Sequence, residues 1–277
     1  MKDSLQNKLG LHFKLQDKLT ALINKAISFQ VPFFQTFFTM PNGKYIIFEN
    51  SDLRNFLDIR REKFKNIYLH ASYYINLCSS YGNGYRIFEK ELNMAKKAEF
   101  THIILHPGAA TGFKNKLEGI DILAKSLNKI LKKENNISIV LENIAHGNLS
   151  IGGDIFDYTI LLSKLDKPDL ISFCIDTAHA YSYGYDLSNA NEQENFINLI
   201  KNQLGIEKIA LIHLNDTSEV LGLKIDKHNI PGQGNIGKDL LKRFINHPQM
   251  ANIPCLIEFP SMPENEQKAI FNEIENW

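Results

Sequence analysis

Short apolar segments recur along the whole of this 277-residue chain, and their spacing is the strongest constraint on its fold. Each is four to eight residues long and mostly continuous rather than alternating, which is typical of strands that are buried on both faces. They occupy residues 10–13, 31–38, 66–71, 101–108, 138–143, 171–176, 209–216 and 254–260. In the middle of the chain, their first residues lie 33 to 38 positions apart.

Between these segments, residues 18–29, 85–100, 117–134 and 195–205 carry apolar side chains at helical steps of three and four. Repeated alternation of strand and helix predicts a parallel sheet with right-handed crossovers, and eight such strands close into a barrel. An open doubly wound sheet is the alternative, but no glycine fingerprint follows the first strand. We therefore predict an α/β fold, a (β/α)8 TIM barrel, with residues 1–277 forming a single domain.

The composition gives no sign of a nucleic-acid partner, because 31 basic and 31 acidic residues leave a formal net charge of zero. Local patches or bound cations would have to attract a phosphate backbone.

Cys174 and Cys255 sit in apolar segments and Cys78 is far from both, which predicts buried, reduced thiols. The N-terminus has no apolar signal core and the longest apolar runs are too short to span a bilayer. We expect a cytoplasmic protein without membrane association.

Six consecutive predicted strands end in side chains that can bind a metal, at the barrel end where such folds carry their chemistry. These are His70, His106, Glu142, Asp176, His213 and Glu258, and the loops add His179, Asp226 and His228. Each has an ordinary alternative: a strand-end histidine can be structural, Asp176 can cap the following helix, and Asp226–His228 can be a solvated loop. Together they would leave like charges buried and unpaired unless cations lie among them.

Nine ligands exceed the four or five of a single zinc ion and suit two or three ions. Mixed imidazole and carboxylate ligands around clustered divalent ions suit phosphodiester hydrolysis, in which a pair of metal ions turns a bridging water into hydroxide. Four carboxylates bring about −4 and three divalent ions about +6, so the occupied site would attract anions. Among the remaining histidines, only His12 lies at a predicted strand end, and it is interpreted as a packing residue or a contact behind the ligands. The others, His102, His146 and His247, lie elsewhere.

Seven motifs resemble, in order along nearly the whole chain, those of the endonuclease IV family of apurinic/apyrimidinic endonucleases. They are HASYYINL (70–77), LHPG (105–108), LEN (141–143), DTAHAY (176–181), HLND (213–216), DKH with its GQGNIG tail (226–237) and IEFP (257–260). The resemblance implies a barrel with three Zn²⁺ ions, which Mn²⁺ could replace. It also implies cleavage of double-stranded DNA 5′ to abasic sites in base excision repair, leaving a 3′-hydroxyl.

The same resemblance implies a role for each residue. One ion would be held by His70, His106 and Glu142, a second by Glu142, Asp176, His213 and Glu258, and the third by His179, Asp226 and His228. Glu142, Asp176 and Glu258 are the predicted catalytic residues. Tyr73 matches the tyrosine that enters the DNA near the lesion, and Lys44 and Lys227 are further DNA-binding candidates.

The chain departs from the family pattern in the loops that contact DNA. HFKLQDKL (12–19) keeps only the histidine of a His-x-Ser stretch. TMPNGKYIIF (39–48) aligns Asn42 with an arginine that penetrates the duplex and Lys44 with a tryptophan, while Lys227 replaces an arginine. Lys44, Tyr45 or Tyr74 are candidates to compensate. The ligand set is complete, but the loops that wedge into DNA differ.

Two other functions stay open from the sequence. A sugar isomerase or epimerase of the same barrel superfamily would need one metal site, for which Glu142, Asp176, His213 and Glu258 suffice. A protein that recognises lesions or structured DNA without efficient cutting would also explain the altered loops. We expect a monomer in either case.

Overall fold

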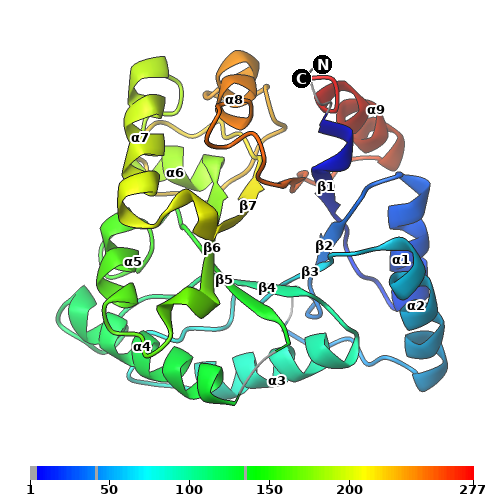
Figure 1. Cartoon of the computed structure of the whole chain (residues 1–277), viewed down its shortest axis with the longest axis horizontal. Helices are drawn as coiled ribbons and strands as arrows, with labels where there is room; N and C mark the ends of the chain where they lie inside the picture. Colours follow the sequence, from blue (N-terminus) through cyan, green and yellow to red (C-terminus); the bar gives the residue numbers. More distant parts are fainter. Residues whose placement is uncertain (1–4, 41–42, 134–135) are drawn as a thin grey trace.

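The computed structural model describes residues 5–40, 43–133 and 136–277, which form a closed parallel barrel surrounded by helices (Figure 1). The strands are β1 (Leu9–His12), β2 (Phe34–Thr36), β3 (Tyr68–His70), β4 (His102–Leu105), β5 (Ser138–Glu142), β6 (Ile171–Asp176), β7 (Ile209–His213) and β8 (Cys255–Ile257). They follow one another in chain order, and β1 pairs with β8 to close the barrel. The predicted (β/α)8 TIM barrel is confirmed.

The strands are shorter than the apolar segments that predicted them. Phe38 and Leu214 lie beyond the ends of β2 and β7 and are nevertheless buried. Burial therefore continues into the loops after hydrogen bonding between strands has stopped, and an apolar run overestimates strand length.

The helices are α1 (Leu19–Ser28), α2 (Asn50–Lys63), α3 (Gly84–Lys97), α4 (Lys116–Lys132), α5 (Ile155–Leu162), α6 (Thr177–Tyr183), α7 (Ala190–Gln203), α8 (Lys238–Ile245) and α9 (Glu264–Ile274). Short 3₁₀ helices at Leu5–Asn7, Pro168–Leu170 and Ile206–Lys208 precede β1, β6 and β7. Of these helices, α1, α3, α4 and α7 correspond to the four predicted segments. Within the described part of the chain, none combines the length and hydrophobicity that a membrane span requires.

The barrel interior is filled by one ring of apolar side chains beneath a ring of polar ones. The apolar ring consists of Phe33, Tyr68, Ile104, Val140, Cys174, Leu211 and Leu256. Because side chains alternate between the two faces of a strand, the residue two positions later also faces inward. On β3 to β8, that residue is in turn His70, His106, Glu142, Asp176, His213 and Glu258. The fold thus places six predicted ligands on a single layer at the carboxyl-terminal end of the barrel.

The same alternation brings two further polar residues to this layer. Gly10 on β1 lies beside Phe33, and a Cβ atom at Gly10 would lie 2.3 Å from the Phe33 ring, so only glycine leaves room for it. Two positions after Gly10 and Phe33 come His12 and Gln35. Gln35 is fully buried.

Candidate metal centre

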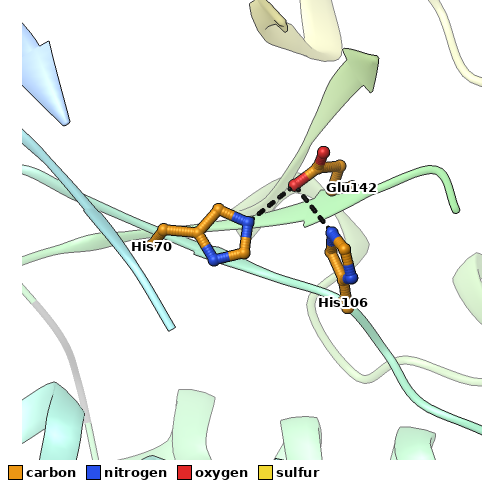
Figure 2. Close-up of side chains that lie close together, drawn as sticks. All are labelled: His70, His106 and Glu142. Atoms are coloured by element: carbon orange, nitrogen blue, oxygen red, sulfur yellow. Dashed lines mark hydrogen bonds and ion pairs between the residues drawn. The ribbon is translucent and has the colours of Figure 1, made fainter. Parts of the chain in front are cut away.

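Glu142 lies at the centre of the polar layer, in contact with imidazoles from three other strand ends. Its Oε2 atom lies 3.1 Å from Nε2 of His70 and 3.2 Å from Nε2 of His106, and Figure 2 shows both rings pointing at this oxygen. Its Oε1 atom lies 2.9 Å from Nδ1 of His213. Glu142, His70 and His213 are at most 1% exposed. One carboxylate without access to water therefore lies against imidazole nitrogens from several strand ends.

The outer nitrogens of two of these rings are held by acceptors, which sets their tautomers. Nδ1 of His70 lies 2.8 Å from the carbonyl oxygen of Ala71, and Nε2 of His213 lies 3.0 Å from Oε1 of Gln35. Because both oxygens only accept hydrogen bonds, these two nitrogens carry hydrogen. The remaining nitrogens face Glu142 and can present a lone pair to a cation that displaces their proton. Metal-binding histidines are commonly oriented in this way.

A second concentration of ligands lies around His179, at the start of α6. Nδ1 of His179 donates to the carbonyl oxygen of Asn143 at 2.9 Å, so Nε2 faces the site. That Nε2 atom lies 3.0 Å from Oδ1 of Asp226 and 3.3 Å from Nε2 of His228. Two imidazole nitrogens at this distance, with a carboxylate beside them, form a suitable environment for a cation.

Asp176 connects the two concentrations of ligands. Its Oδ1 atom accepts from the backbone N–H of His179 at 2.8 Å, which caps α6. Its Oδ2 atom accepts from the Asn215 side chain at 2.7 Å and lies 3.4 Å from Nε2 of His228. Asp176 therefore has the geometry of a helix cap and of a ligand at once, since each oxygen serves a different purpose.

The structure brings all nine predicted ligands to this centre. Among the described residues, ligand atoms within 4.8 Å of one another form the sets His70–His106–Glu142, Glu142–Asp176–His213–Glu258 and Asp176–His179–His228, with Asp226 adjoining the last. A further set contains Cys174 with Glu142 and His213. Burial raises the pKa of the Cys174 thiol to about 12, so this sulfur stays protonated while no metal ion is bound.

Charge is strongly coupled across the centre. Burial lowers the pKa of His179, but the carboxylates of Asp176 and Asp226 outweigh it and hold that pKa well above its usual value. Burial raises the pKa of Glu142, yet His213 and His106 hold it well below its usual value. In the absence of an ion, the protonated rings of His179 and His213 thus offset part of the carboxylate charge.

The donor set fits divalent metal ions. Nε2 of His106 is buried and makes no hydrogen bond with the described residues, although it points at Glu142. Imidazole nitrogens and carboxylate oxygens are the ligands that zinc and related transition ions prefer. Cations at this centre would satisfy such nitrogens and replace the protons as the source of positive charge.

Two residues behind the ligands were not predicted as part of the site. Gln35 donates through Nε2 to Oε1 of Glu258 at 2.7 Å and also contacts Nδ1 of His12 at 3.0 Å. Asn215 donates to Oε2 of Glu258 at 3.1 Å. The available signal for Gln35 was a polar residue within the apolar run VPFFQTFF that, unlike its neighbour Thr36, is in phase with the inward-facing positions.

Asp216 organises the loop that carries Asp226 and His228. It is fully buried, and its carboxylate accepts hydrogen bonds from the backbone N–H groups of Gly232, Gly234, Ile236 and Gly237. A Cβ atom at Gly234 would lie 2.4 Å from Oδ1 of Asp216. The glycines of the GQGNIG segment therefore allow the backbone to wrap around a carboxylate.

The predicted DNA-binding residues lie on loops of the same rim. Tyr73 is 60% exposed, and its ring centroid lies 5.3 Å from that of His70 and 5.2 Å from that of His106. It also borders a cavity of about 870 Å³ that is lined by the loops after β1, β2 and β3. Lys227 forms an ion pair with Glu219 at 3.1 Å.

The loop after β2 carries the remaining predicted contacts. Lys44 is exposed on it, whereas Asn42 lies outside the described residues. The hydroxyl of Tyr45 donates to the buried carboxylate of Glu91 at 3.1 Å, and Glu91 also accepts from the backbone N–H of Ser72. Tyr45 thus ties the loop after β2 to the loop that carries Tyr73.

Comparisons with known proteins show the family to which this chain belongs. A family model described as a xylose isomerase-like TIM barrel matches residues 30–276. The "Probable endonuclease 4" of Thermosipho africanus is 32% identical over 207 residues, which cover 73% of this chain and 72% of that protein. That of Clostridium beijerinckii is 29% identical over 261 residues, covering 92% and 93%.

Solved structures share the fold. Endonuclease IV from Thermus thermophilus has a TM-score of 0.83 at 22% identity and covers 97% of both chains. A D-tagatose 3-epimerase-like protein has a TM-score of 0.68 at 17% identity, covering 96% of both. This chain is a xylose isomerase-like TIM barrel with a polar centre built from its strand ends. Within that class, it belongs to the endonuclease IV family.

Proposed function

We propose that this protein is a zinc-dependent endodeoxyribonuclease that hydrolyses the phosphodiester bond 5′ to abasic sites in double-stranded DNA, in base excision repair. The observation that carries the proposal is the presence of three adjoining ligand sets, which share Glu142 and Asp176, in place of a single set. Membership of the endonuclease IV family supports the same activity.

The ligands would be divided as the motifs imply. Glu142 would bridge two ions, one also held by His70 and His106, the other by Asp176, His213 and Glu258. The third ion would be held by His179, Asp226 and His228. Three Zn²⁺ ions, or Mn²⁺ in their place, would supply Lewis-acid activation of a water nucleophile and neutralise charge on the phosphoryl oxygens.

The remaining residues of the site would orient these ligands and the DNA. Gln35 and Asn215 each hydrogen-bond one oxygen of Glu258, which fixes the plane of its carboxylate. Tyr73 lies over the rings of His70 and His106 and would contact the DNA at the lesion, with Lys44 and Lys227 on the phosphate backbone. We propose that residues 1–277 act as one nuclease domain, as a monomer in the cytoplasm.

A sugar epimerase or isomerase is the second candidate, since proteins of that kind share the barrel. One metal site made of Glu142, Asp176, His213 and Glu258 would suffice for it. Five further ligands, His70, His106, His179, Asp226 and His228, would then have no purpose at the barrel mouth. Their convergence on the same centre favours the nuclease.

The test is incubation of metal-loaded protein with a duplex that contains one abasic analogue, alongside an intact duplex and a known endonuclease IV. We expect incision at the analogue alone. Failure to incise, with the known enzyme active in parallel, would refute the activity. Elemental analysis separates the candidates: we expect about three ions per chain, whereas a stoichiometry of one would favour the epimerase. Specific binding to the lesion without cutting would identify a recognition protein.

A further inference from the structure

The loop after β7 exposes four aliphatic side chains immediately before the ligands that it carries. Val220, Leu221, Leu223 and Ile225 are 67%, 38%, 47% and 43% exposed. These residues, which we call the apolar strip, lie within six positions of one another and lead directly into Asp226 and His228. A cluster of exposed aliphatic residues beside a polar centre is a sign of an interaction surface.

The side chains of this segment differ in their exposure. From Leu221 to His228 burial alternates, with residues 221, 223, 225 and 227 exposed and residues 222, 224, 226 and 228 partly buried. Asp226 and His228 contact His179 and Asp176 of the metal centre, whereas the apolar strip and Lys227 are exposed to solvent on the surface beside it.

The strip is held in place by backbone hydrogen bonds. The N–H of Leu223 donates to the carbonyl oxygen of Val220 at 3.1 Å, and Gly222 has a φ of 75°, as a turn of type II requires at its third position. The N–H of Gly222 donates to Tyr181 at 3.2 Å, and that of Lys224 to Ser182 at 2.8 Å. The exposed side chains are thus presented by a preformed turn docked on α6.

We propose that the apolar strip is a wedge that packs against the faces of the bases flanking an abasic site; this rests on the proposed function. A substrate at the centre must lie against this loop, because the loop itself contributes Asp226 and His228. Loss of a base leaves its neighbours without a stacking partner, so their apolar faces are open to aliphatic side chains. Apolar wedges at unstacked base steps are an established mode of DNA binding. Lys227 then meets the adjoining phosphate.

The test uses the double variant Val220→Ser/Leu223→Ser and a matched control, Leu170→Ser. Leu170 is 50% exposed but precedes β6, at the opposite end of the barrel. Metal-loaded protein is mixed with a duplex that carries a tetrahydrofuran abasic analogue beside 2-aminopurine, whose fluorescence reports unstacking. Stopped-flow fluorescence and incision are measured on the same sample.

We expect the wild type and Leu170→Ser to raise the fluorescence and the double variant to lose most of that response. Its KM should rise about tenfold, because roughly 50 Å² of apolar surface would no longer be buried against the bases, with the single-turnover rate unchanged. An unchanged fluorescence response and KM would overturn the proposal. So would sedimentation showing a wild-type dimer that the double variant dissociates, because the strip would then bind a second copy.

The proposed function and the wedge can fail separately. A wild type that raises the fluorescence through the strip without incising would refute the nuclease activity and leave the wedge. Incision with a response that does not depend on the strip would refute the wedge alone. A wild type that neither incises nor raises the fluorescence would overturn both.

Discussion

Replacement of Glu142 with glutamine changes one atom at the centre of the site. The side chain keeps its size, but it loses its charge and one oxygen becomes an NH₂ group. The Glu142 oxygens lie 2.9 to 3.2 Å from nitrogens of His70, His106 and His213. The variant would therefore point N–H hydrogens at an imidazole where the wild type offers a lone pair to a cation.

The size of the effect follows from the number of interactions that the Glu142 carboxylate makes. Each interaction with a charged group contributes about 1.5–3 kcal/mol, and Glu142 serves two ligand sets. Removal of one interaction from each set amounts to about 3–6 kcal/mol, or roughly a 10²- to 10⁴-fold decrease in incision rate and metal affinity. Glu142→Ala should lose activity by orders of magnitude for the same reason.

The assay compares incision of the abasic duplex with metal content measured by mass spectrometry. Glu99→Gln is the matched control, because Glu99 is a carboxylate before β4, at the other end of the barrel, and forms an ion pair with Arg61 at 2.6 Å. The control should behave as the wild type. Near-wild-type incision by Glu142→Gln, with full metal content, would show that Glu142 is misassigned.

Three other perturbations test the surroundings of the centre. Asp216→Asn removes the charge that five backbone N–H groups share, those of Thr217, Gly232, Gly234, Ile236 and Gly237, so we expect a melting temperature lower by about 4–10 °C and loss of the third ion; an unchanged melt and metal content would contradict this. The pKa values of His179 and His213 are raised in the folded protein, so their protonated rings stabilise the metal-free protein fully at a pH below about 6.5. This stabilisation is lost as the pH rises through the raised pKa values. In the presence of a chelator, the melting temperature should therefore fall between pH 6 and pH 9. A melting temperature that does not change over this range would refute the link between protonation and stability. Gln35→Leu removes the donor to Oε1 of Glu258 and the acceptor for Nε2 of His213 and should weaken metal binding about 10- to 100-fold in chelator competition; equal affinity would exclude a positioning role.

The local sequence was sufficient to predict the barrel and the position of its candidate metal ligands. Continuous apolar runs mark strands that are covered on both faces, and a period of two identifies which side chain follows the inward-facing core residue. Glu142 after Val140 and His213 after Leu211 are examples. In contrast, α2 was missed because only Asp52 and Phe56 are buried on it, so its apolar stripe is too thin to recognise.

Residues behind the ligands could not be predicted because their partners are distant in sequence. Gln35 and Glu258 are 223 positions apart and meet only when β1 pairs with β2 and β8. From the motif HLND alone, Asp216 also cannot be distinguished from a metal ligand. Its burial against five backbone N–H groups gives it a structural role in place of a catalytic one.

The sequence by itself determined which side chains face the barrel interior, because alternation along a strand is a local property of the backbone. The tertiary structure alone decided how those side chains meet. Barrel closure brings one carboxylate, Glu142, to three imidazoles, and the acceptors at Ala71 and Gln35 decide which ring nitrogen faces it. It also gives Asp176 both of the roles that the sequence left as alternatives, since one oxygen caps α6 and the other faces His228.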